Sequence, residues 1–312
     1  MQVRKYHVAD VFTASLTMFH GSIVALVTPM TEMGKIDFSA LARLVDFHLE
    51  QGTNGFVLGG TTGESASLKT KELEALLHAV IGQVDGRIPV IAGTGSASTD
   101  HTISNTQLAG RLGADAALVV TPYYVRPMQN GLEAHFRAVA DASTIPLILY
   151  NVPSRTAVDM TAETTASLSR HDSIVAIKEA LPDMERIRSL VQNCQKGFTV
   201  LSGDDPSCLD ALKNGAKGVI SVTANVVPDR LAELATSANA GNWVTADAID
   251  STLRELNTLL AAETNPIPVK WCVFEMGLIG SRIRLPMTML QETWHTKMKA
   301  CLRKLECSRR EA

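Results

Sequence analysis

IVAIK, residues 174–178, is a short apolar run that ends in a lysine and is followed at once by Glu179 and Ala180. Its four apolar residues, three of them β-branched, predict a buried strand. Burying an unpaired ammonium costs several kcal/mol. Lys178 therefore either extends its amine to solvent at the strand's end, or keeps it neutral for nucleophilic attack on a carbonyl group. The run by itself leaves both interpretations open.

Seven more runs of this kind alternate with amphipathic stretches of helical length. The eight predicted strands are 23–27, 55–58, 89–92, 116–120, 146–150, 174–178, 199–202 and 219–222. The predicted helices that follow them are 38–50, 71–84, 101–112, 132–142, 161–168, 184–191, 206–213 and 228–240. Eight strand–helix units in about 220 residues predict an α/β fold, a (β/α)8 TIM barrel. A doubly wound open sheet is the alternative, but Thr28-Pro29-Met30 is not the glycine-rich phosphate turn that it would favour.

The chain beyond Gly241 has no further strand pattern and predicts helices over 245–262, 268–276 and 288–305. We therefore expect an N-terminal extension over 1–17, the barrel over 18–241 and a C-terminal helical domain over 242–312. The extension lacks the continuous apolar core of a signal peptide, and a second methionine, Met18, stands before the first strand. We expect it to be poorly ordered, or to precede the true start; a targeting arm is the less favoured interpretation.

Composition excludes several classes of function. The 312 residues carry a formal charge of −3 and are 46% hydrophobic, as in soluble globular proteins. This slight acidity gives no basic footprint for nucleic acid or an anionic membrane, and no apolar run is long enough to cross a bilayer. The five cysteines have no CxxC spacing, so we expect free thiols in a cytoplasmic protein.

Polar residues collect where the predicted strands end, which is where the active sites of TIM barrels lie. The segments are 59–65 (GGTTGES), 121–124 (TPYY), 150–155 (YNVPSR), 178–179 (KE), 203–205 (GDD) and 221–225 (SVTAN). The GGTTG run could be only a tight turn, but its backbone N–H groups and hydroxyls could also bind a carboxylate. Tyr150 could be strand filler or, beside Lys178, a proton shuttle. Arg155 could be a surface ion-pair partner or a bidentate clamp for a carboxylate.

Absent motifs narrow the chemistry. The eight histidines are scattered, with no HxH or HExxH spacing, so we expect no metal and no other cofactor. Barrels that bind phosphate commonly do so after strands seven and eight, where Asp204 and Asp205 would repel a dianion. The substrate is therefore predicted to be a non-phosphorylated carboxylate.

The motifs taken together resemble the dihydrodipicolinate synthase family of pyruvate-dependent class I aldolases, from about residue 18 to about residue 305. The resemblance is carried by GSIVALVTPM (21–30), GGTTGES (59–65), PVIAGTG (89–95), TPYYVRP (121–127), YNVPSRT (150–156), AIKEA (176–180), LSGDD (201–205), GVISVTAN (218–225) and NPIPVKW (265–271). It implies a Schiff-base-forming lyase that condenses pyruvate with L-aspartate 4-semialdehyde to 4-hydroxy-tetrahydrodipicolinate, for lysine and diaminopimelate synthesis. It also implies a homotetramer made of tight dimers.

The resemblance implies a catalytic role for four residues. Lys178 matches the lysine that forms a Schiff base with pyruvate, and Tyr150 the tyrosine that carries protons to and from it. Thr61 and Tyr124 match the relay partners of that tyrosine, and the family's equivalent of Tyr124 is supplied by the neighbouring subunit.

Four further residues are implied in substrate binding. Thr62 matches the residue that binds the pyruvate carboxylate, and Ile220 lies where a backbone carbonyl lines the pyruvate pocket. Arg155 matches the arginine that holds the carboxylate of the semialdehyde, and Gly203, after the seventh strand, completes the predicted set.

One site departs from the family pattern. Members that lysine inhibits usually carry Asn and Glu where this chain has Ala97 and His101, and often His in place of Leu73. The resemblance therefore implies weak or absent inhibition by lysine. Two other functions stay open: an N-acetylneuraminate lyase or keto-deoxy-sugar aldolase with the same lysine and tyrosine, and a barrel that binds a keto acid without turnover.

Overall fold

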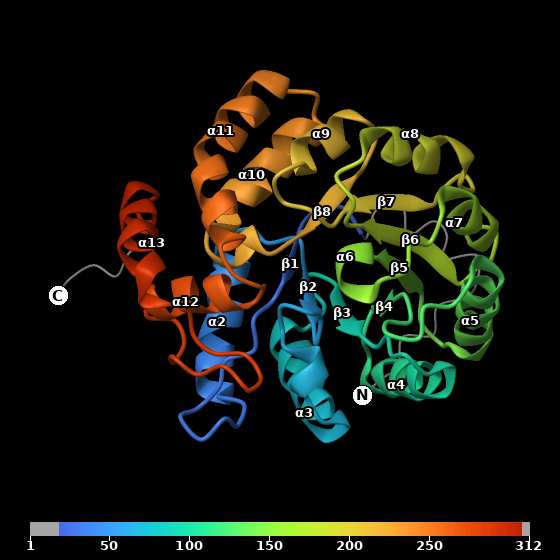
Figure 1. Ribbon diagram of the computed structural model, residues 1–312, viewed down its shortest axis with the longest axis horizontal. Coiled ribbons are helices and arrows are strands. Elements are labelled where there is room, and N and C mark those ends of the chain that lie inside the picture. Colours follow the sequence, from blue (N-terminus) through green and yellow to red (C-terminus); the bar gives the residue numbers. More distant parts are fainter. Residues whose placement is uncertain (1–18, 308–312) are drawn as a thin grey trace.

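The computed structural model describes residues 19–307, and its eight parallel strands close into a barrel in chain order (Figure 1). The strands are β1 (Gly21–Ala25), β2 (Gly55–Leu58), β3 (Val90–Gly93), β4 (Ala116–Val120), β5 (Leu147–Asn151), β6 (Ile174–Glu179), β7 (Thr199–Ser202) and β8 (Gly218–Ser221). The predicted (β/α)8 barrel is confirmed. The N-terminal extension predicted over 1–17 lies outside the described residues.

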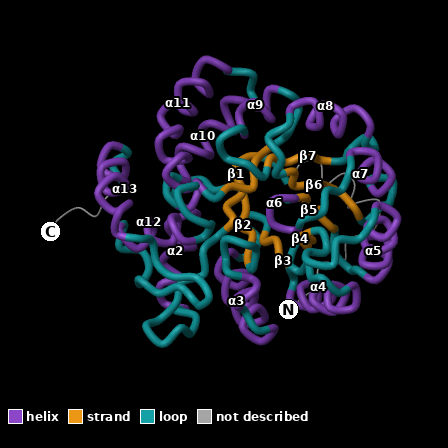
Figure 2. The backbone as a smooth tube through the Cα atoms, in the orientation of Figure 1, coloured by secondary structure: helices purple, strands orange, loops and turns teal. Residues whose placement is uncertain are grey.

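Helices surround the barrel and connect successive strands (Figures 1 and 2). They are α2 (Phe38–Glu50), α3 (Thr70–Val84), α4 (Thr99–Leu112), α5 (Gln129–Ala142), α7 (Ala162–Leu168), α8 (Met184–Asn193), α9 (Cys208–Lys213) and α10 (Pro228–Asn239). Short helical turns follow three strands: η1 (Ser65–Ser67), α6 (Pro153–Thr156) and η2 (Thr223–Asn225). Three more helices, α11 (Trp243–Leu260), α12 (Ile267–Glu275) and α13 (Glu292–Lys304), form the predicted C-terminal helical region beside α10.

Alternation of side chains along the strands produces two apolar layers. One set of residues fills the inside of the barrel, including Ile23, Ile91, Ile148 and Leu201. Phe19, two residues before β1, packs into this layer. The intervening strand residues pack outward against the helices, so both faces of the sheet are dry, as a parallel sheet requires.

Most predicted element boundaries are shifted by a few residues in the structure, and two of these shifts have a visible cause. The first strand was expected over 23–27 but spans Gly21–Ala25, because the Val27 N–H donates to the Asn225 side chain, 3.0 Å away, and not to a neighbouring strand. The last helix was expected from residue 288 but begins at Glu292. Arg284 holds the preceding loop in place, with hydrogen bonds to Gly34 O at 2.9 Å and Ser67 O at 2.8 Å. A side chain far along the sequence decides each boundary.

Candidate active site

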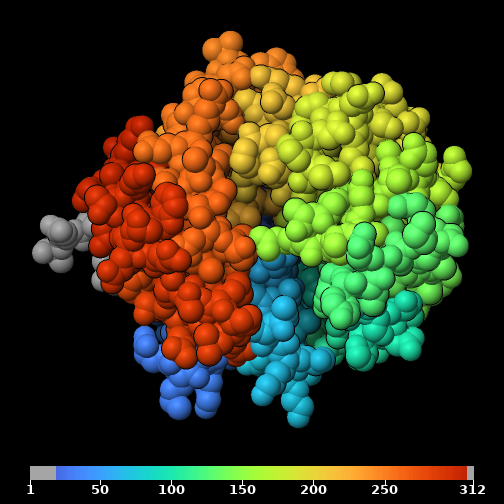
Figure 3. Space-filling view, viewed as in Figure 1, coloured from blue at the N-terminus to red at the C-terminus, as the bar shows by residue number. Residues whose placement is uncertain are grey.

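A cavity of about 600 Å³ opens at the end of the barrel where the strands finish. It is visible as the hollow at the centre of the molecule in Figure 3. The barrel supplies most of its lining, and one wall comes from residues 257 and 260–265, at the end of α11 and in the loop that follows. The C-terminal helical region is therefore part of the site.

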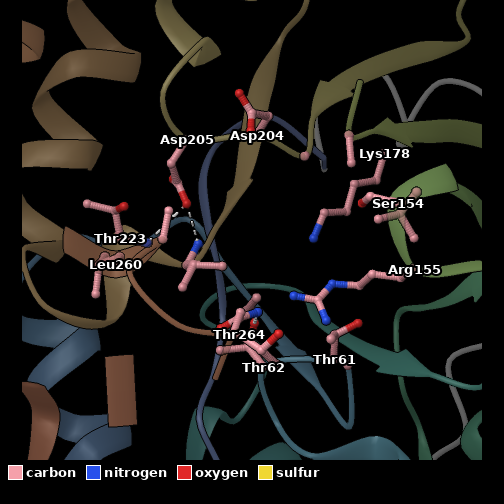
Figure 4. Close-up of a pocket in the computed structure, with 18 of the residues that line it drawn as sticks. Thr61, Thr62, Ser154, Arg155, Lys178, Asp204, Asp205, Thr223, Leu260 and Thr264 are labelled. Carbon is pink, nitrogen blue, oxygen red and sulfur yellow. Dashed lines mark hydrogen bonds between the residues drawn. The ribbon is translucent and has the colours of Figure 1, made fainter. Parts of the chain in front are cut away.

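Lys178 extends from β6 into this cavity (Figure 4). Its side chain is 5% exposed, and within the described residues its amine forms no hydrogen bond or ion pair. The amine lies 4.5 Å from the ring centre of Tyr150, its register partner on β5. A buried amine that faces the cavity without a carboxylate partner is placed to attack a carbonyl carbon of a ligand there, as a nucleophilic lysine needs. The structure thus removes the alternative that Lys178 merely extends to solvent.

Glu179 does not neutralise Lys178, although it is the next residue. Successive strand residues point to opposite faces, so the Glu179 carboxylate lies outside the barrel. There it accepts hydrogen bonds from Arg186 Nε at 2.7 Å and from Asn151 Nδ2 at 3.1 Å. Burial raises the pKa of Glu179, and Arg186 acts in the opposite direction. This carboxylate joins α8 to the strands, separate from the chemistry of the cavity.

Gly203, directly after β7, makes room for the lysine. A Cβ at this position would lie 2.9 Å from both Cγ and Cε of Lys178 and 3.1 Å from the Cβ of Ala180. Since Cβ contacts below 3.0 Å are essentially never observed, any larger residue would displace the lysine stem. Gly203 thus shapes the nucleophile's position.

Asp205 is a buried carboxylate in the cavity wall that sequence reasoning considered only as a barrier to phosphate. It accepts a short hydrogen bond from the Ser221 hydroxyl and others from the N–H groups of Val222, at 2.8 Å, and Thr223, at 3.1 Å. Burial raises the pKa of Asp205; the Ser221 hydrogen bond is the largest of the effects that lower it, and the charge of Lys178 also acts in that direction. Asp205 therefore fixes the loop after β8. The GDD sequence was the available signal for it.

Thr61 and Thr62, after β2, line the cavity on the side nearest Arg155 of α6. Figure 4 shows the Arg155 guanidinium between Lys178 and these two threonines. Thr62 is 2% exposed, and its oxygen accepts a hydrogen bond from Asn265 Nδ2 at 3.0 Å. Two hydroxyls and a guanidinium at one end of a cavity form a site suited to carboxylate groups.

Two of the predicted residues lie elsewhere. Tyr124 follows β4 in a loop, with its side chain 89% exposed and outside the cavity lining. No hydrogen bond between described residues connects Tyr124, Tyr150 and Thr61. Ile220 is buried in the barrel interior, in the apolar layer that also contains Tyr150. The structure therefore brings together Lys178, Tyr150, Thr61, Thr62, Arg155 and Gly203.

Sequence reasoning missed the contribution of the C-terminal region. Asn257 accepts a hydrogen bond from the Thr223 hydroxyl at 2.7 Å, and both residues line the cavity. Asn265 contacts Thr62, which lies 203 positions earlier. The only signal was the NPIPVKW motif, to which no role had been given.

Within residues 19–307, no cluster of three or more His, Cys, Asp or Glu side chains is arranged to hold a metal ion. Over the same range, no helix combines the length and apolar character needed to span a membrane.

Known proteins are similar to this chain over nearly its whole length. Residues 18–305 match the Dihydrodipicolinate synthetase family. A 4-hydroxy-tetrahydrodipicolinate synthase from Stutzerimonas stutzeri is 49% identical over 286 residues, covering 92% of this chain and 98% of the relative. The enzyme of that name from Pseudomonas aeruginosa is 48% identical over the same shares of both chains.

Solved structures of dihydrodipicolinate synthases have the same fold as this chain. The crystal structure of a chloride-inhibited dihydrodipicolinate synthase from Acinetobacter baumannii, complexed with pyruvate, superposes with a TM-score of 0.91 at 44% identity, covering 92% of this chain and 99% of that one. The enzyme from Aquifex aeolicus gives a TM-score of 0.91 at 42% identity, covering 94% and 100%. The chain belongs to the dihydrodipicolinate synthetase family.

Proposed function

We propose that this protein is a lyase that condenses pyruvate with L-aspartate 4-semialdehyde to give 4-hydroxy-tetrahydrodipicolinate, in lysine and diaminopimelate synthesis. The observation that carries the proposal is the placement of Lys178, buried in the cavity wall with no carboxylate partner among the described residues and with its amine over the Tyr150 ring. Relatives that bear the name of this activity are 49% and 48% identical over 92% of the chain.

In this proposal the Lys178 amine adds to the ketone carbon of pyruvate. Water leaves, and a carbon–nitrogen double bond forms between lysine and substrate. The positive charge on that nitrogen makes a methyl proton of pyruvate acidic, and its removal gives an enamine. Tyr150 is the group in the lining that can transfer these protons, since its ring lies 4.5 Å from the lysine nitrogen.

The enamine carbon then attacks the aldehyde carbon of the semialdehyde, whose oxygen takes up a proton. The amine of that substrate next adds to the carbon–nitrogen double bond and expels the Lys178 amine, which closes the ring and frees the enzyme. Thr62 and Arg155 are assigned to the carboxylates of the two substrates, because their donors line the same end of the cavity. Thr61 and Tyr124 complete the proton path, and Ile220 offers a backbone carbonyl.

We propose that Tyr124 acts from a neighbouring subunit of a tight dimer, two of which make a homotetramer. Its exposed side chain stands in a loop with three other exposed apolar residues: Tyr123, Val125 and Met128. Four exposed apolar side chains within one loop favour burial of that loop against a partner. All five cysteines are free, as expected of a protein that acts in the cytoplasm.

The test combines trapping with turnover. Borohydride added with pyruvate should reduce the Schiff base and give a permanent mass increase on Lys178, which the Lys178→Ala variant should lack. The purified protein should then consume pyruvate with the semialdehyde in a coupled assay and leave N-acetylneuraminate untouched. Trapping without turnover of the semialdehyde would contradict the synthase activity, and absence of trapping would contradict Schiff-base chemistry altogether.

A further inference from the structure

The Thr62 hydroxyl accepts one hydrogen bond and donates none within the described residues. Its oxygen accepts from Asn265 Nδ2 at 3.0 Å, and its own proton has no acceptor among the described residues. The side chain is 2% exposed and lines the cavity. Leaving a buried donor unsatisfied costs about 1–3 kcal/mol, so its proton is available for a ligand in the cavity.

A hydroxyl can donate one hydrogen bond and accept two, and rotation about its C–O bond lets the proton point in several directions. A donor behind the oxygen removes part of that freedom, because the hydroxyl proton must then point away from the donating amide. Asn265 Nδ2 is such a donor to Thr62, and both residues line the cavity, so the Thr62 proton is directed away from Asn265. The arrangement converts an adaptable hydroxyl into a donor directed at an oxygen of the ligand.

Asn265 makes this contact from the segment just before α12, a helix that is anchored to the threonine loop. The bond to Thr62 is the only hydrogen bond of its amide in the described part of the chain, and its Oδ1 atom is buried without a partner. The residue stands just before α12, whose Lys270 forms a buried ion pair with Glu64. Since Glu64 is two positions after Thr62, α12 and the threonine loop are connected at two neighbouring points.

We infer that Asn265 is a positioning residue: it orients the Thr62 hydroxyl as a donor to the substrate carboxylate and acts on the substrate only through Thr62. The inference rests on the proposed function, since it takes pyruvate as the ligand of Thr62. It makes the C-terminal helical region a determinant of pyruvate affinity, although Lys178 and Thr62 belong to the barrel.

A double-mutant cycle on pyruvate affinity tests this directly. The half-saturating pyruvate concentration is measured by borohydride trapping, and the KM for pyruvate and kcat by the coupled assay, in Asn265→Ala, Thr62→Val and the variant with both changes. Each single change should raise half-saturation about tenfold, the effect of losing a hydrogen bond to a charged group. The double variant should be no worse than Thr62→Val alone. Thermal unfolding verifies that each variant is folded.

Asn265→Asp is a second, nearly isosteric probe. A carboxylate can only accept, so it would turn the Thr62 proton away from the cavity as well as repel pyruvate. Its half-saturating concentration should rise further than that of Asn265→Ala. The matched control is Asn193→Ala, which removes an exposed amide-to-hydroxyl hydrogen bond, from Asn193 Nδ2 to Ser189 Oγ at 3.1 Å, outside the cavity lining; its half-saturation should change less than twofold.

The outcomes separate this inference from the proposed function. If wild-type protein is trapped but the effects of Asn265→Ala and Thr62→Val multiply, Asn265 acts independently of Thr62 and the inference is overturned. An Asn265→Asp variant with wild-type affinity overturns it as well. If pyruvate gives no adduct with the wild-type protein, both the inference and the proposed function fail.

Discussion

Glu64 and Lys270 form an ion pair that is almost completely buried between the barrel and α12. The Glu64 carboxylate also accepts a hydrogen bond from the Arg284 N–H at 3.0 Å, so two segments of the C-terminal region meet on one barrel side chain. Burial lowers the pKa of Lys270, and the neighbouring Glu64 charge opposes that effect. The loop that carries Thr61 and Thr62 is therefore fixed by charge as well as by packing.

Removing one member of this pair should destabilise the protein strongly. Glu64→Gln leaves the Lys270 ammonium buried without a counter-charge, which typically costs about 3–5 kcal/mol in the free energy of unfolding. Urea unfolding measures the loss. Combining Glu64→Gln with Lys270→Met should recover much of it, because no unpaired charge then remains. A single variant within about 1 kcal/mol of wild type would show that the pair is not a major stabilising contact.

The barrel and most of the lysine's surroundings could be predicted because they follow from local patterns. The run 174–178 became the centre of β6, with Lys178 at the cavity as predicted. Apolar periodicity places a strand, and a parallel barrel brings the ends of all strands to one face. Tyr150, on the neighbouring strand, thus comes beside Lys178 through topology alone.

The contacts that tune the site could not be predicted, because they join residues far apart in sequence. Asn265 reaches Thr62, and Asn225 ends β1 by accepting from Val27. No periodicity in the chain encodes such pairs. The exposed position of Tyr124 has a different reason: its proposed site of action lies on another subunit, which a single chain cannot display.

Stability should fall below neutral pH because His48 is buried as a neutral ring. It lies on α2, with Nδ1 3.0 Å from the Thr53 hydroxyl and its ring edge-on to Phe56, and burial lowers its pKa from 6.5 to about 3. Below pH 6.5 the unfolded chain takes up a proton that the folded protein resists, so unfolding is favoured as pH falls towards 3. Between pH 7 and pH 5 this group alone should remove about 2 kcal/mol.

Urea unfolding of wild type and His48→Gln at the two pH values measures this contribution. The variant should lose less stability on acidification than wild type, by about 2 kcal/mol. The exposed His78 on α3 supplies the control, since His78→Gln should retain the wild-type pH dependence. Equal pH dependence in wild type and His48→Gln would contradict the assignment.

Gly203→Ala should impair chemistry without unfolding the protein. The added methyl would meet the Lys178 stem at 2.9 Å, so the amine must move relative to Tyr150 and the ligand. Misplacing a reacting group by about 1 Å can reduce the rate about a hundredfold. The rate of borohydride trapping with saturating pyruvate measures this effect. Gly82→Ala in α3 is the control, because a Cβ there meets no atom within 4 Å; comparable trapping rates in the two variants would rule out the steric argument.

Lysine should inhibit this enzyme weakly or not at all. Ala97 and His101 lie at the start of α4 and its preceding turn, where inhibited members of the family usually have an amide and a carboxylate. Each charge-assisted hydrogen bond lost to a cationic ligand is worth about 1.5–3 kcal/mol. Initial rates with increasing L-lysine test the prediction. Introducing Ala97→Asn and His101→Glu together should confer inhibition, whereas strong inhibition of the wild-type protein well below a millimolar would refute it.

If Tyr124 acts in a neighbouring subunit, two inactive variants should restore each other's activity. Tyr124 has a φ of 72°, a backbone conformation that costs a non-glycine residue about 1 kcal/mol or more and that clusters at functional positions. Tyr124→Phe should lower kcat about a hundredfold by removing a proton-transfer group, and Lys178→Ala should abolish turnover. In a dimer containing one chain of each, the Tyr124→Phe chain keeps its lysine and receives an intact tyrosine from its partner. Co-expression with two different tags and purification through both should therefore recover up to about half of the wild-type rate, because one of the two sites is complete. If Tyr124 instead served its own chain, both sites of the mixed dimer would lack an essential group, and the doubly purified protein would be as inactive as its parents.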